Sequence, residues 1–174
     1  YQSTILVVDG KAYIWGNKNA CQNMADVAKA ELTNVKKAVL SNFYALFLLE
    51  DGSVACPGGV LNAERVVNAA GDTVYLMDYL KGKKVVDIAA SNGCFAFLLE
   101  SGEVLVQGAA RYGEDKVVEI PAGEKLVKLD GGANHFVGVS DANKAYAWGS
   151  NDKGQCKING KSCTDAYAGA YQSY

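Results

Sequence analysis

The sequence predicts an all-β protein built from a repeated β-hairpin, and three observations support this. Residues 35–58 align without a gap with residues 85–108, and ten of these positions are identical. Each matching segment holds a short apolar run, a turn, and a second short run that ends at glycine. The closing glycines are 42, 50 and 41 residues apart, at Gly16, Gly58, Gly108 and Gly149. Strands with a period near 40 residues are typical of a β-propeller-like array of four-stranded blades, here with about four repeat units.

Each of the four hairpins is expected to turn at two residues. These turns are Asp9-Gly10, Asp51-Gly52, Ser101-Gly102 and Ala142-Asn143. Gly or Asn in the second place fits a hairpin turn with a positive φ. The flanking residues are largely β-branched and aromatic, as strands prefer. A β-sandwich with strands that are similar by chance is the alternative, and the ten identities disfavour it.

Two segments between the hairpins are expected to be helical. Residues 24–32 carry three alanines, which favour helix, and residues 76–80 form a short apolar segment before Lys81-Gly82. Both lie between repeat units, where the sequence matches end.

We expect residues 1–174 to form a single repeat domain. Its approximate units are residues 1–31, 32–82, 83–123 and 124–163, followed by a closing strand segment at residues 164–174. The tripeptide Tyr-Gln-Ser at residues 1–3 recurs at residues 171–173, so the chain begins and ends at the same phase of the repeat. Either the last strand joins the first hairpin and closes a small ring, or this is a partial propeller whose missing strands come from a longer chain or from neighbouring chains.

The composition excludes several classes of protein. The chain has 174 residues, of which 49% are hydrophobic and 21% charged, as in ordinary globular proteins. Its net charge of −2 does not favour nucleic-acid binding, which depends on neutralising phosphates. The apolar runs are too short to span a bilayer, and no signal peptide is visible. We therefore expect a cytoplasmic protein, or part of an assembled particle, rather than a secreted one.

The five cysteines are Cys21, Cys56, Cys94, Cys156 and Cys163. An odd number fits free thiols better than a complete set of disulfides. Cys156 and Cys163, with six residues between them, could pair across a loop, and their state stays open.

A known repeat is recognisable near the C-terminus. Residues 132–135 read Gly-Ala-Asn-His, and residues 148–155 read Trp-Gly-Ser-Asn-Asp-Lys-Gly-Gln. With the apolar strand and turn between them, they resemble the regulator-of-chromosome-condensation repeat, most completely over residues 126–155. The first unit keeps Asp9-Gly10 and residues 13–16 (Tyr-Ile-Trp-Gly), but Cys21 replaces the glycine expected before Gln22.

The second and third units match this pattern less well. They keep the apolar strand and the turn, but Pro57 and Gln107 stand at the tryptophan position, and the Gly-Gln pair is missing. The resemblance implies a propeller of about seven four-stranded blades. Members of the family act as exchange factors for the small GTPase Ran, as protein-binding scaffolds and as secreted enzyme inhibitors. With about four degenerate units, a closed small ring and a partial propeller both remain open.

The sequence predicts no catalytic, cofactor-binding or metal-binding residues. His135 is the only histidine, and we expect it to be a structural residue that satisfies backbone groups of a blade. Asp9, Asp51 and Asp141 are single acids in turns rather than calcium ligands. The glycine-rich segments at residues 57–59 and 131–132 lack the pattern of a phosphate-binding loop, and backbone freedom explains them.

Two further groups of side chains are explained by solvation or packing rather than by binding. Lys36-Lys37 and the lysines of residues 81–84 are expected in solvated loops or at guarded strand edges. The tyrosines of the tail are expected to pack on the last blade rather than to form a binding surface; they are Tyr167, Tyr171 and Tyr174.

The function that follows is that of a non-catalytic β-propeller binding module for protein–protein interaction. The alternatives are a structural subunit of a large assembly (a virion, phage fibre or cytoskeletal structure) and an exchange-factor-like regulator of a small GTPase. The expected partner is another protein, or further copies of the chain through strand edges. No enzyme activity, cofactor, small-molecule substrate, nucleic acid or membrane insertion is expected.

Overall fold

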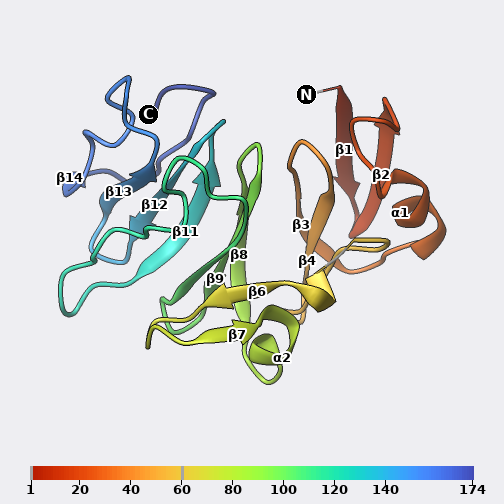
Figure 1. Ribbon diagram of the computed structural model, residues 1–174, viewed down its shortest axis with the longest axis horizontal. Helices are drawn as coiled ribbons and strands as arrows, with labels where there is room; N and C mark the ends of the chain where they lie inside the picture. Colours follow the sequence, from red (N-terminus) through yellow and green to blue (C-terminus); the bar gives the residue numbers. More distant parts are fainter. Residues whose placement is uncertain (1, 60) are drawn as a thin grey trace.

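The computed structural model describes residues 2–59 and 61–174 (Figure 1). Strands make up 41% of the chain and helices 9%, and the strands form several small antiparallel sheets. Tyr1 of the repeated tripeptide and Val60 of the second expected unit lie outside the described residues. Within the described part of the chain, the helices are too short to cross a membrane.

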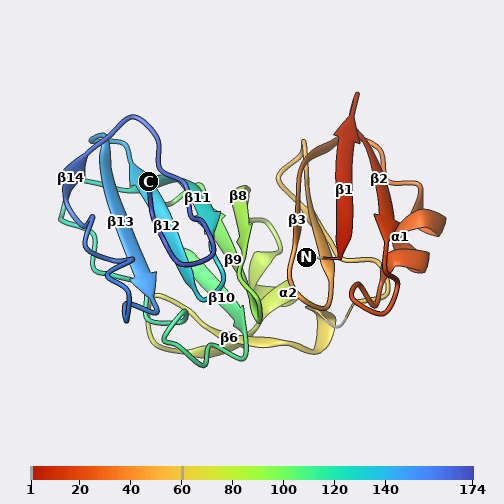
Figure 2. The ribbon, with the colours of Figure 1, turned by 90° about the horizontal axis from the view of Figure 1, so that it is seen from above.

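Four sheets follow one another along the chain and fan out side by side (Figure 2). The first sheet is the hairpin of β1 (Ser3–Val8) and β2 (Lys11–Gly16). The second sheet contains β3 (Val35–Leu40), β4 (Ala45–Leu49) and β5 (Val54–Ala55). The first sheet stands at one end of the fan in Figure 2.

The third and fourth sheets continue the fan. The third sheet contains β8 (Val85–Ala90), β9 (Cys94–Leu99) and β10 (Val104–Gly108). The fourth contains β11 (Leu126–Gly131), β12 (His135–Ser140), β13 (Lys144–Gly149) and β14 (Lys161–Ser162). The predicted four-stranded blade is therefore complete, among the described residues, in the fourth sheet alone.

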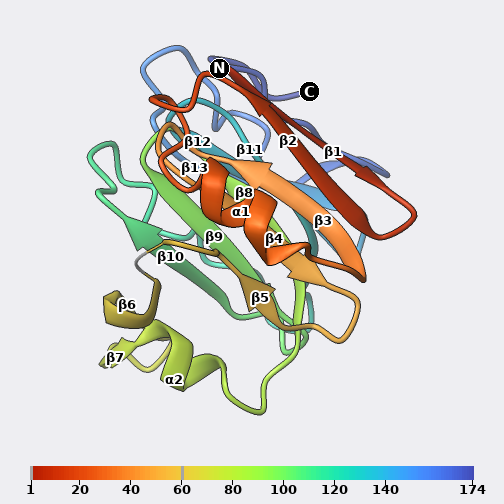
Figure 3. The same cartoon turned by 90° about the vertical axis from the view of Figure 1, so that its right-hand side faces the viewer.

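Both segments expected to be helical are helices. α1 (Met24–Ala30) follows the first sheet and buries Val27, and α2 (Leu76–Leu80) follows the second. A 3-10 helix (Leu61–Ala63) and the hairpin of β6 (Arg65–Val67) and β7 (Thr73–Tyr75) precede α2. This insertion accounts for the longest spacing between closing glycines. It lies at the bottom of Figure 3, with β6 in contact with β10.

Three of the four turns differ from the prediction. Asp9 (φ 48°) and Gly10 (φ 74°) form the expected two-residue turn. In the second sheet, however, Leu49 pairs with Ser53 across three residues, of which Gly52 has a φ of 84°. The third and fourth sheets turn in the same way, with Gly102 and Asn143 at positive φ. The prediction of two residues was wrong here because a three-residue turn also ends on a left-handed residue.

The shorter first turn changes the phase of β1. Ser3 lies opposite Gly16, as His135 lies opposite Gly149. At the other end of the chain, Gln172 corresponds to His135. The carbonyl of Gln172 accepts a hydrogen bond from the nitrogen of Gly169, just as the carbonyl of His135 accepts one from the nitrogen of Gly132. The Tyr-Gln-Ser repeat is thus one residue out of phase in the structure, and the expectation of identical phase is corrected by one residue.

The core lies between neighbouring sheets. Phe47 is fully buried between the first and second sheets, Phe97 between the second and third, and Phe136 between the third and fourth. Each fully buried side chain of this kind contributes about 1.5–3 kcal/mol through loss of apolar surface to water. The sheets are therefore held in their order by apolar faces that pack against each other.

Candidate binding site at the axis of the arc

The first strands of the larger sheets lie side by side. β3 contacts β8, and β8 contacts β11; we call these three the inner strands (Figure 1). A Cβ on Gly131 would collide with the backbone oxygen of Ala90 in β8. Neither Gly131 nor Gly132 has a positive φ. The reason for these glycines is therefore close approach between strands, rather than the backbone freedom that the sequence suggested.

Backbone hydrogen bonds join the ends of the inner strands. The nitrogen of Asn42 donates to the oxygen of Asn92 (3.0 Å), and the nitrogen of Asn92 donates to the oxygen of Ala133 (2.8 Å). The nitrogen of Ala133 in turn donates to the oxygen of Ala170 (3.1 Å). Since these four residues occupy the same place in successive units, the C-terminal tail stands where the next inner strand belongs.

The tail folds as the beginning of another unit. Gly169 donates to the oxygen of Gln172 (2.8 Å), and Tyr167 and Tyr174 exchange backbone hydrogen bonds. The nitrogen of Ala168 donates to the carboxylate of Asp130 in β11 (2.9 Å). We call residues 165–169 the tail strand, although only Ala168 among them forms a β-bridge, with Ser173. It lies against the fourth sheet rather than beside β1, and the described residues do not form a closed sheet.

His135 ties the tail to the fourth sheet. Its ring is fully buried, and Nε2 lies 3.1 Å from the hydroxyl oxygen of Ser173. A Cβ on Gly132 would collide with this ring. Burial holds the pKa of His135 below its ordinary value. The side chain thus contacts the tail through the Ser173 hydroxyl and the backbone of Gln172.

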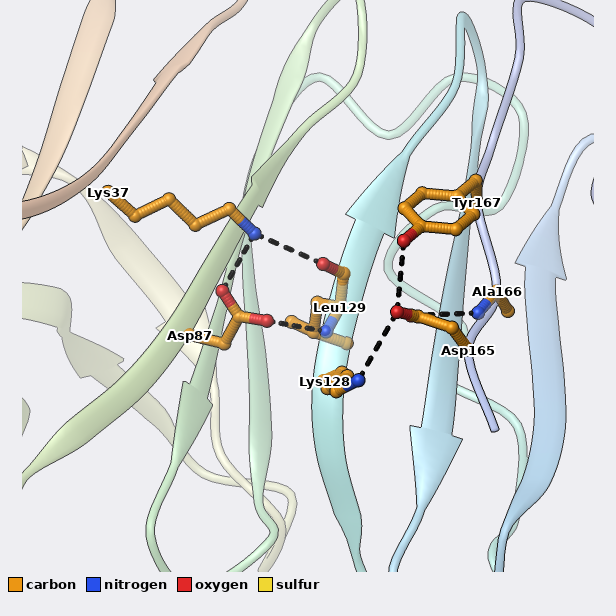
Figure 4. Close-up of polar contacts among 7 residues, drawn as sticks. All are labelled: Lys37, Asp87, Lys128, Leu129, Asp165, Ala166 and Tyr167. Carbon is orange, nitrogen blue, oxygen red and sulfur yellow. Dashed lines mark hydrogen bonds and ion pairs between the residues drawn. The ribbon is translucent and has the colours of Figure 1, made fainter. Parts of the chain in front are cut away.

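An ion pair joins the second and third sheets (Figure 4). The Nζ of Lys37 lies 2.8 Å from a carboxylate oxygen of Asp87 and also donates to the oxygen of Leu129 (3.2 Å). The other carboxylate oxygen of Asp87 accepts a hydrogen bond from the nitrogen of Leu129 (2.7 Å). One carboxylate therefore connects three inner strands. The expectation that Lys37 is a solvated or edge-guarding lysine was wrong, because β3 is flanked by β8.

A second ion pair joins the fourth sheet to the tail strand. The Nζ of Lys128 lies 3.3 Å from Asp165, which also accepts a hydrogen bond from the hydroxyl of Tyr167 (2.9 Å; Figure 4). The Tyr167 hydrogen bond first, and Lys128 as well, hold the pKa of Asp165 below its usual value. Each of these charged residues stands five positions before one of the backbone-linked residues Asn42, Asn92, Ala133 and Ala170. In order along the chain, they are Lys37, Asp87, Lys128 and Asp165. We call this alternating series the charge ladder.

A pocket of about 700 Å³ opens where the inner strands end. Asn42, Asn92 and Ala133 line it, together with Gln2, which precedes β1, and Ala170 of the tail. The described lining residues carry no formal charge; they include amides, hydroxyls and small side chains, together with the apolar Leu40. We call it the axial pocket. Its groups both donate and accept hydrogen bonds, which suits a neutral polar ligand.

The remaining predicted side chains lie away from this pocket or serve the fold. Asp51 caps its own turn by accepting hydrogen bonds from Ser53, which hold its pKa below the usual value. All five cysteines are free thiols, including Cys156 and Cys163. Burial, with a smaller contribution from Cys21, raises the pKa of Cys56 to about 11, so this thiol stays protonated near neutral pH.

The tail tyrosines are exposed, so the expectation that they pack on the last blade was wrong. The exposed fractions are 59% for Tyr167, 61% for Tyr171 and 69% for Tyr174. The alternation of the tail strand turns Ala166 towards the fourth sheet instead.

The sequence pattern missed one buried acid. A side-chain oxygen of Glu114 accepts a hydrogen bond from the nitrogen of Tyr112, as that of Gln155 does from Lys153. Glu114 also stands six residues after a closing glycine, as Gln155 does. Counting from Gly108 would have revealed a Gly-Glu pair in place of the Gly-Gln pair.

Comparison with known proteins shows which repeat and which proteins this chain is similar to. Residues 126–155 match the family model described as the regulator of chromosome condensation (RCC1) repeat. This segment is similar to one RCC1 repeat. Among curated proteins, human E3 ubiquitin-protein ligase HERC2 is 34% identical over 90 residues, which cover 45% of this chain and 2% of HERC2.

Solved structures show the same fold over nearly the whole chain. The CRINKLY WD40 ectodomain of the Arabidopsis thaliana receptor kinase ACR4 is 20% identical, with a TM-score of 0.57, and the match covers 95% of this chain and 51% of that one. Human WBSCR16 is 14% identical, with a TM-score of 0.61 and coverage of 97% and 54%. The chain thus has an RCC1-like propeller fold and spans about half the length of these solved proteins.

Proposed function

We propose that this chain is a non-catalytic protein-interaction module that receives an extended, uncharged segment of a partner protein in the axial pocket. The observation that carries the proposal is the pocket's lining. Asn42, Asn92, Ala133 and Ala170 hold the same place in successive units, so the pocket repeats one backbone position along its wall, with amide side chains at the first two places. An extended peptide also presents its backbone groups at regular intervals.

The absence of charge in the described lining favours a neutral segment. A carboxylate or ammonium group that entered the pocket would lose water without gaining a counter-charge there. The Asn42 amide instead offers one acceptor and two donors, and the Gln2 amide, whose oxygen already accepts a hydrogen bond from Asn17, adds two donors. Backbone, serine, threonine, asparagine and glutamine groups are therefore the expected chemistry of the bound segment.

A binding role is also supported by where the titratable groups lie. His135 is buried against Ser173, and the described residues hold no cluster of three or more histidine, cysteine or acidic side chains suited to a metal. RCC1-like and WD40 propellers are generally non-catalytic. Acid–base or metal chemistry would require such groups to converge on one pocket.

Within the same proposal the chain is one repeat domain, residues 1–174. Its units are residues 1–31, 32–82, 83–123 and 124–163, followed by a closing segment at residues 164–174. The places of Asn42, Asn92, Ala133 and Ala170 in one hydrogen-bonded series support this division.

The test is a selection of random displayed peptides on the immobilised chain, followed by affinity measurements on single peptides. Ala170→Trp fills the pocket from an exposed position, and Ala70→Trp makes the same change at an exposed position in the β6–β7 turn. We expect enriched peptides of neutral, polar composition that bind the Ala170→Trp variant at least tenfold more weakly and the Ala70→Trp variant unchanged. Enriched peptides that bind all three proteins equally would refute the proposal, as would a selection that enriches none.

A further inference from the structure

A second pocket, of about 360 Å³, opens between the second and third sheets. We call it the side pocket. Phe43 and Tyr44 line it from the turn before β4, and Gly93 lines it from the matching turn before β9. It is separate from the axial pocket, since Ser41 alone among the described residues lines both. Its volume lies at the lower end of the range for ligand pockets, about 300–1,000 Å³, so it suits one side chain of a partner better than a longer segment.

The side pocket exists because the third unit has small residues where the second has large ones. In the alignment of residues 35–58 with residues 85–108, Phe43 corresponds to Gly93 and Tyr44 to Cys94. A Cβ on Gly93 would meet only the Cβ of Ala109, at 3.9 Å, so the space beside this glycine is open. The φ of Gly93 is not positive, so the backbone does not require glycine here. The small residue therefore leaves room beside the two aromatic rings of the second unit.

Glu64 gives the side pocket a negative charge. It is the single formally charged residue among the described lining residues, and its carboxylate has no hydrogen-bond or ion-pair partner in the part of the chain that the structure describes. The backbone holds Glu64 in place, because its nitrogen donates to the oxygen of Leu61 (3.2 Å) and its oxygen accepts a hydrogen bond from the nitrogen of Leu76 (2.9 Å). Both leucines are buried in the core. The carboxylate is therefore carried on a fixed segment of the insertion and is uncompensated.

The other polar groups of the lining are neutral. Burial raises the pKa of the Cys94 thiol and, to about 11, that of Cys56, so neither thiol adds a charge near neutral pH. The hydroxyl of Tyr44 and the amide of Gln107 also have no hydrogen-bond partner among the described residues. Each has an oxygen that accepts hydrogen bonds, as the Glu64 carboxylate does. The pocket therefore matches a cation that carries several N–H donors.

We propose that the side pocket binds an arginine side chain of a partner protein. A guanidinium group carries one positive charge and five N–H donors in a plane, which complement the carboxylate of Glu64 and the acceptors beside it. It also stacks on aromatic rings, and Phe43, which is 50% exposed, offers such a ring in the lining. A lysine ammonium is a compact, strongly hydrated point charge and fits this combination less well.

The lining also favours an arginine residue within a protein over free arginine. Free arginine carries a carboxylate, and the described lining residues of the side pocket include no cation to receive it. The negative charge of Glu64 would repel that carboxylate as well. Apolar lining residues such as Leu61 and Phe95 suit the methylene groups of a side chain instead. Charge complementarity thus selects a side chain whose backbone remains outside the pocket.

The test is an NMR titration of the isotope-labelled chain with N-acetyl-arginine amide, which presents the side chain as a protein does. We expect saturable shifts of the backbone signals of Gly93 and Gly108, which both line the side pocket. N-acetyl-citrulline amide has the same shape without the charge and should bind at least about tenfold more weakly, because it loses the charged hydrogen bonds to Glu64. N-acetyl-lysine amide should also bind more weakly than the arginine amide, because it lacks the planar group.

Variants test the role of the carboxylate and of the open space. Glu64→Gln should weaken binding of the arginine amide at least about tenfold, because it removes the charge and keeps the shape. Glu119→Gln makes the same change at an exposed residue outside the lining and should leave binding unchanged. Gly93→Phe introduces the residue type of the second unit and should close the pocket. Circular dichroism verifies that each variant is folded.

Several results would overturn the inference. These are equal binding of the arginine and citrulline amides, full binding by the Glu64→Gln variant, and the absence of shifts at Gly93 and Gly108. Free arginine that binds more tightly than its capped amide would overturn the assignment to a protein side chain. Ala170→Trp fills the axial pocket and should leave arginine binding unchanged, so a loss of binding in this variant would refute the side pocket as the site. The peptide selection for the axial pocket does not depend on any of these results.

Discussion

Removal of the Asp87 carboxylate should cost more stability than any other change in the charge ladder. Its side chain is 14% exposed and lies between β3 and β11. Asp87→Ala removes the acceptor of the Leu129 nitrogen, the partner of the Lys37 ammonium, and the acceptor of the Ile88 nitrogen. Two strand-to-strand contacts are therefore lost together, while the backbone of β8 is unchanged.

The size of the effect follows from these contacts. A hydrogen bond to a charged group contributes about 1.5–3 kcal/mol, and the Leu129 nitrogen would be left without this acceptor at a sheet-to-sheet contact. The ion pair adds at most about 1 kcal/mol, because the Lys37 side chain is 36% exposed and solvent screens it. The free energy of unfolding should therefore fall by about 2–4 kcal/mol. Asp87→Asn keeps an acceptor oxygen and should lose about half as much.

Urea unfolding followed by circular dichroism measures these differences. Asp165→Ala is the matched control, because Asp165 holds the same place in the repeat but is 40% exposed and lies 3.3 Å from its lysine. Its loss should be clearly smaller than that of Asp87→Ala. A larger loss for Asp165→Ala, or equal losses for Asp87→Ala and Asp87→Asn, would refute the reasoning that the Leu129 hydrogen bond dominates.

Three further predictions concern the fourth sheet. Burial lowers the pKa of His135 from 6.5, so the unfolded chain takes up the proton first as the pH falls. The free energy of unfolding should therefore fall as the pH drops below about 6.5. His135→Gln should flatten this part of a plot of the urea midpoint against pH, and an unchanged slope would contradict the prediction. Gly132→Ala forces a Cβ into the His135 ring and should cost about 1–3 kcal/mol in urea unfolding. Gly93→Ala, whose Cβ would meet only the Cβ of Ala109 at 3.9 Å, should cost less, and equal costs would count against close approach. Trp148→Phe removes a buried hydrogen bond of 2.9 Å to the oxygen of Glu114 and should cost about 1–3 kcal/mol in thermal unfolding; an unaltered melting temperature would contradict that role.

The hairpins were predictable because their signals are local. Asp9-Gly10, Gly52, Gly102 and Asn143 have the positive φ that their residue types suggested. Apolar runs on either side then set where the strands lie. The length of each turn was not predictable in this way, because a left-handed residue ends both two-residue and three-residue turns.

Contacts between units were harder to predict, because they depend on which strands become neighbours. Lys37 and Asp87 are 50 residues apart and meet only because β3 lies beside β8. The exposure of Tyr171 likewise follows from how the tail turns back after Ala170, which composition does not reveal. For the axial pocket, the sequence showed the repeat but not that the same place in each unit would face one cavity.

The differences between the repeats follow from how the outer strand of each sheet is covered. An outer strand exposes unpaired backbone groups unless another element covers it. In the fourth sheet β14 pairs with β13, in the first sheet α1 packs beside β2, and in the third β6 lies along β10.

The inserted residues are fixed to the third sheet. Glu103, the residue before β10, accepts hydrogen bonds from the nitrogen of Ala69 (2.8 Å) and the hydroxyl of Tyr79. The insertion that lengthens the second unit thus serves the third sheet, which lacks a β14 of its own in the described residues. The segments after Gly16 and Gly108 match the RCC1 pattern less well than residues 150–155 do, and in both places an element outside that pattern covers the outer strand. The sequence therefore departs from the repeat pattern where α1 or β6, rather than a fourth strand, covers the outer strand of the sheet.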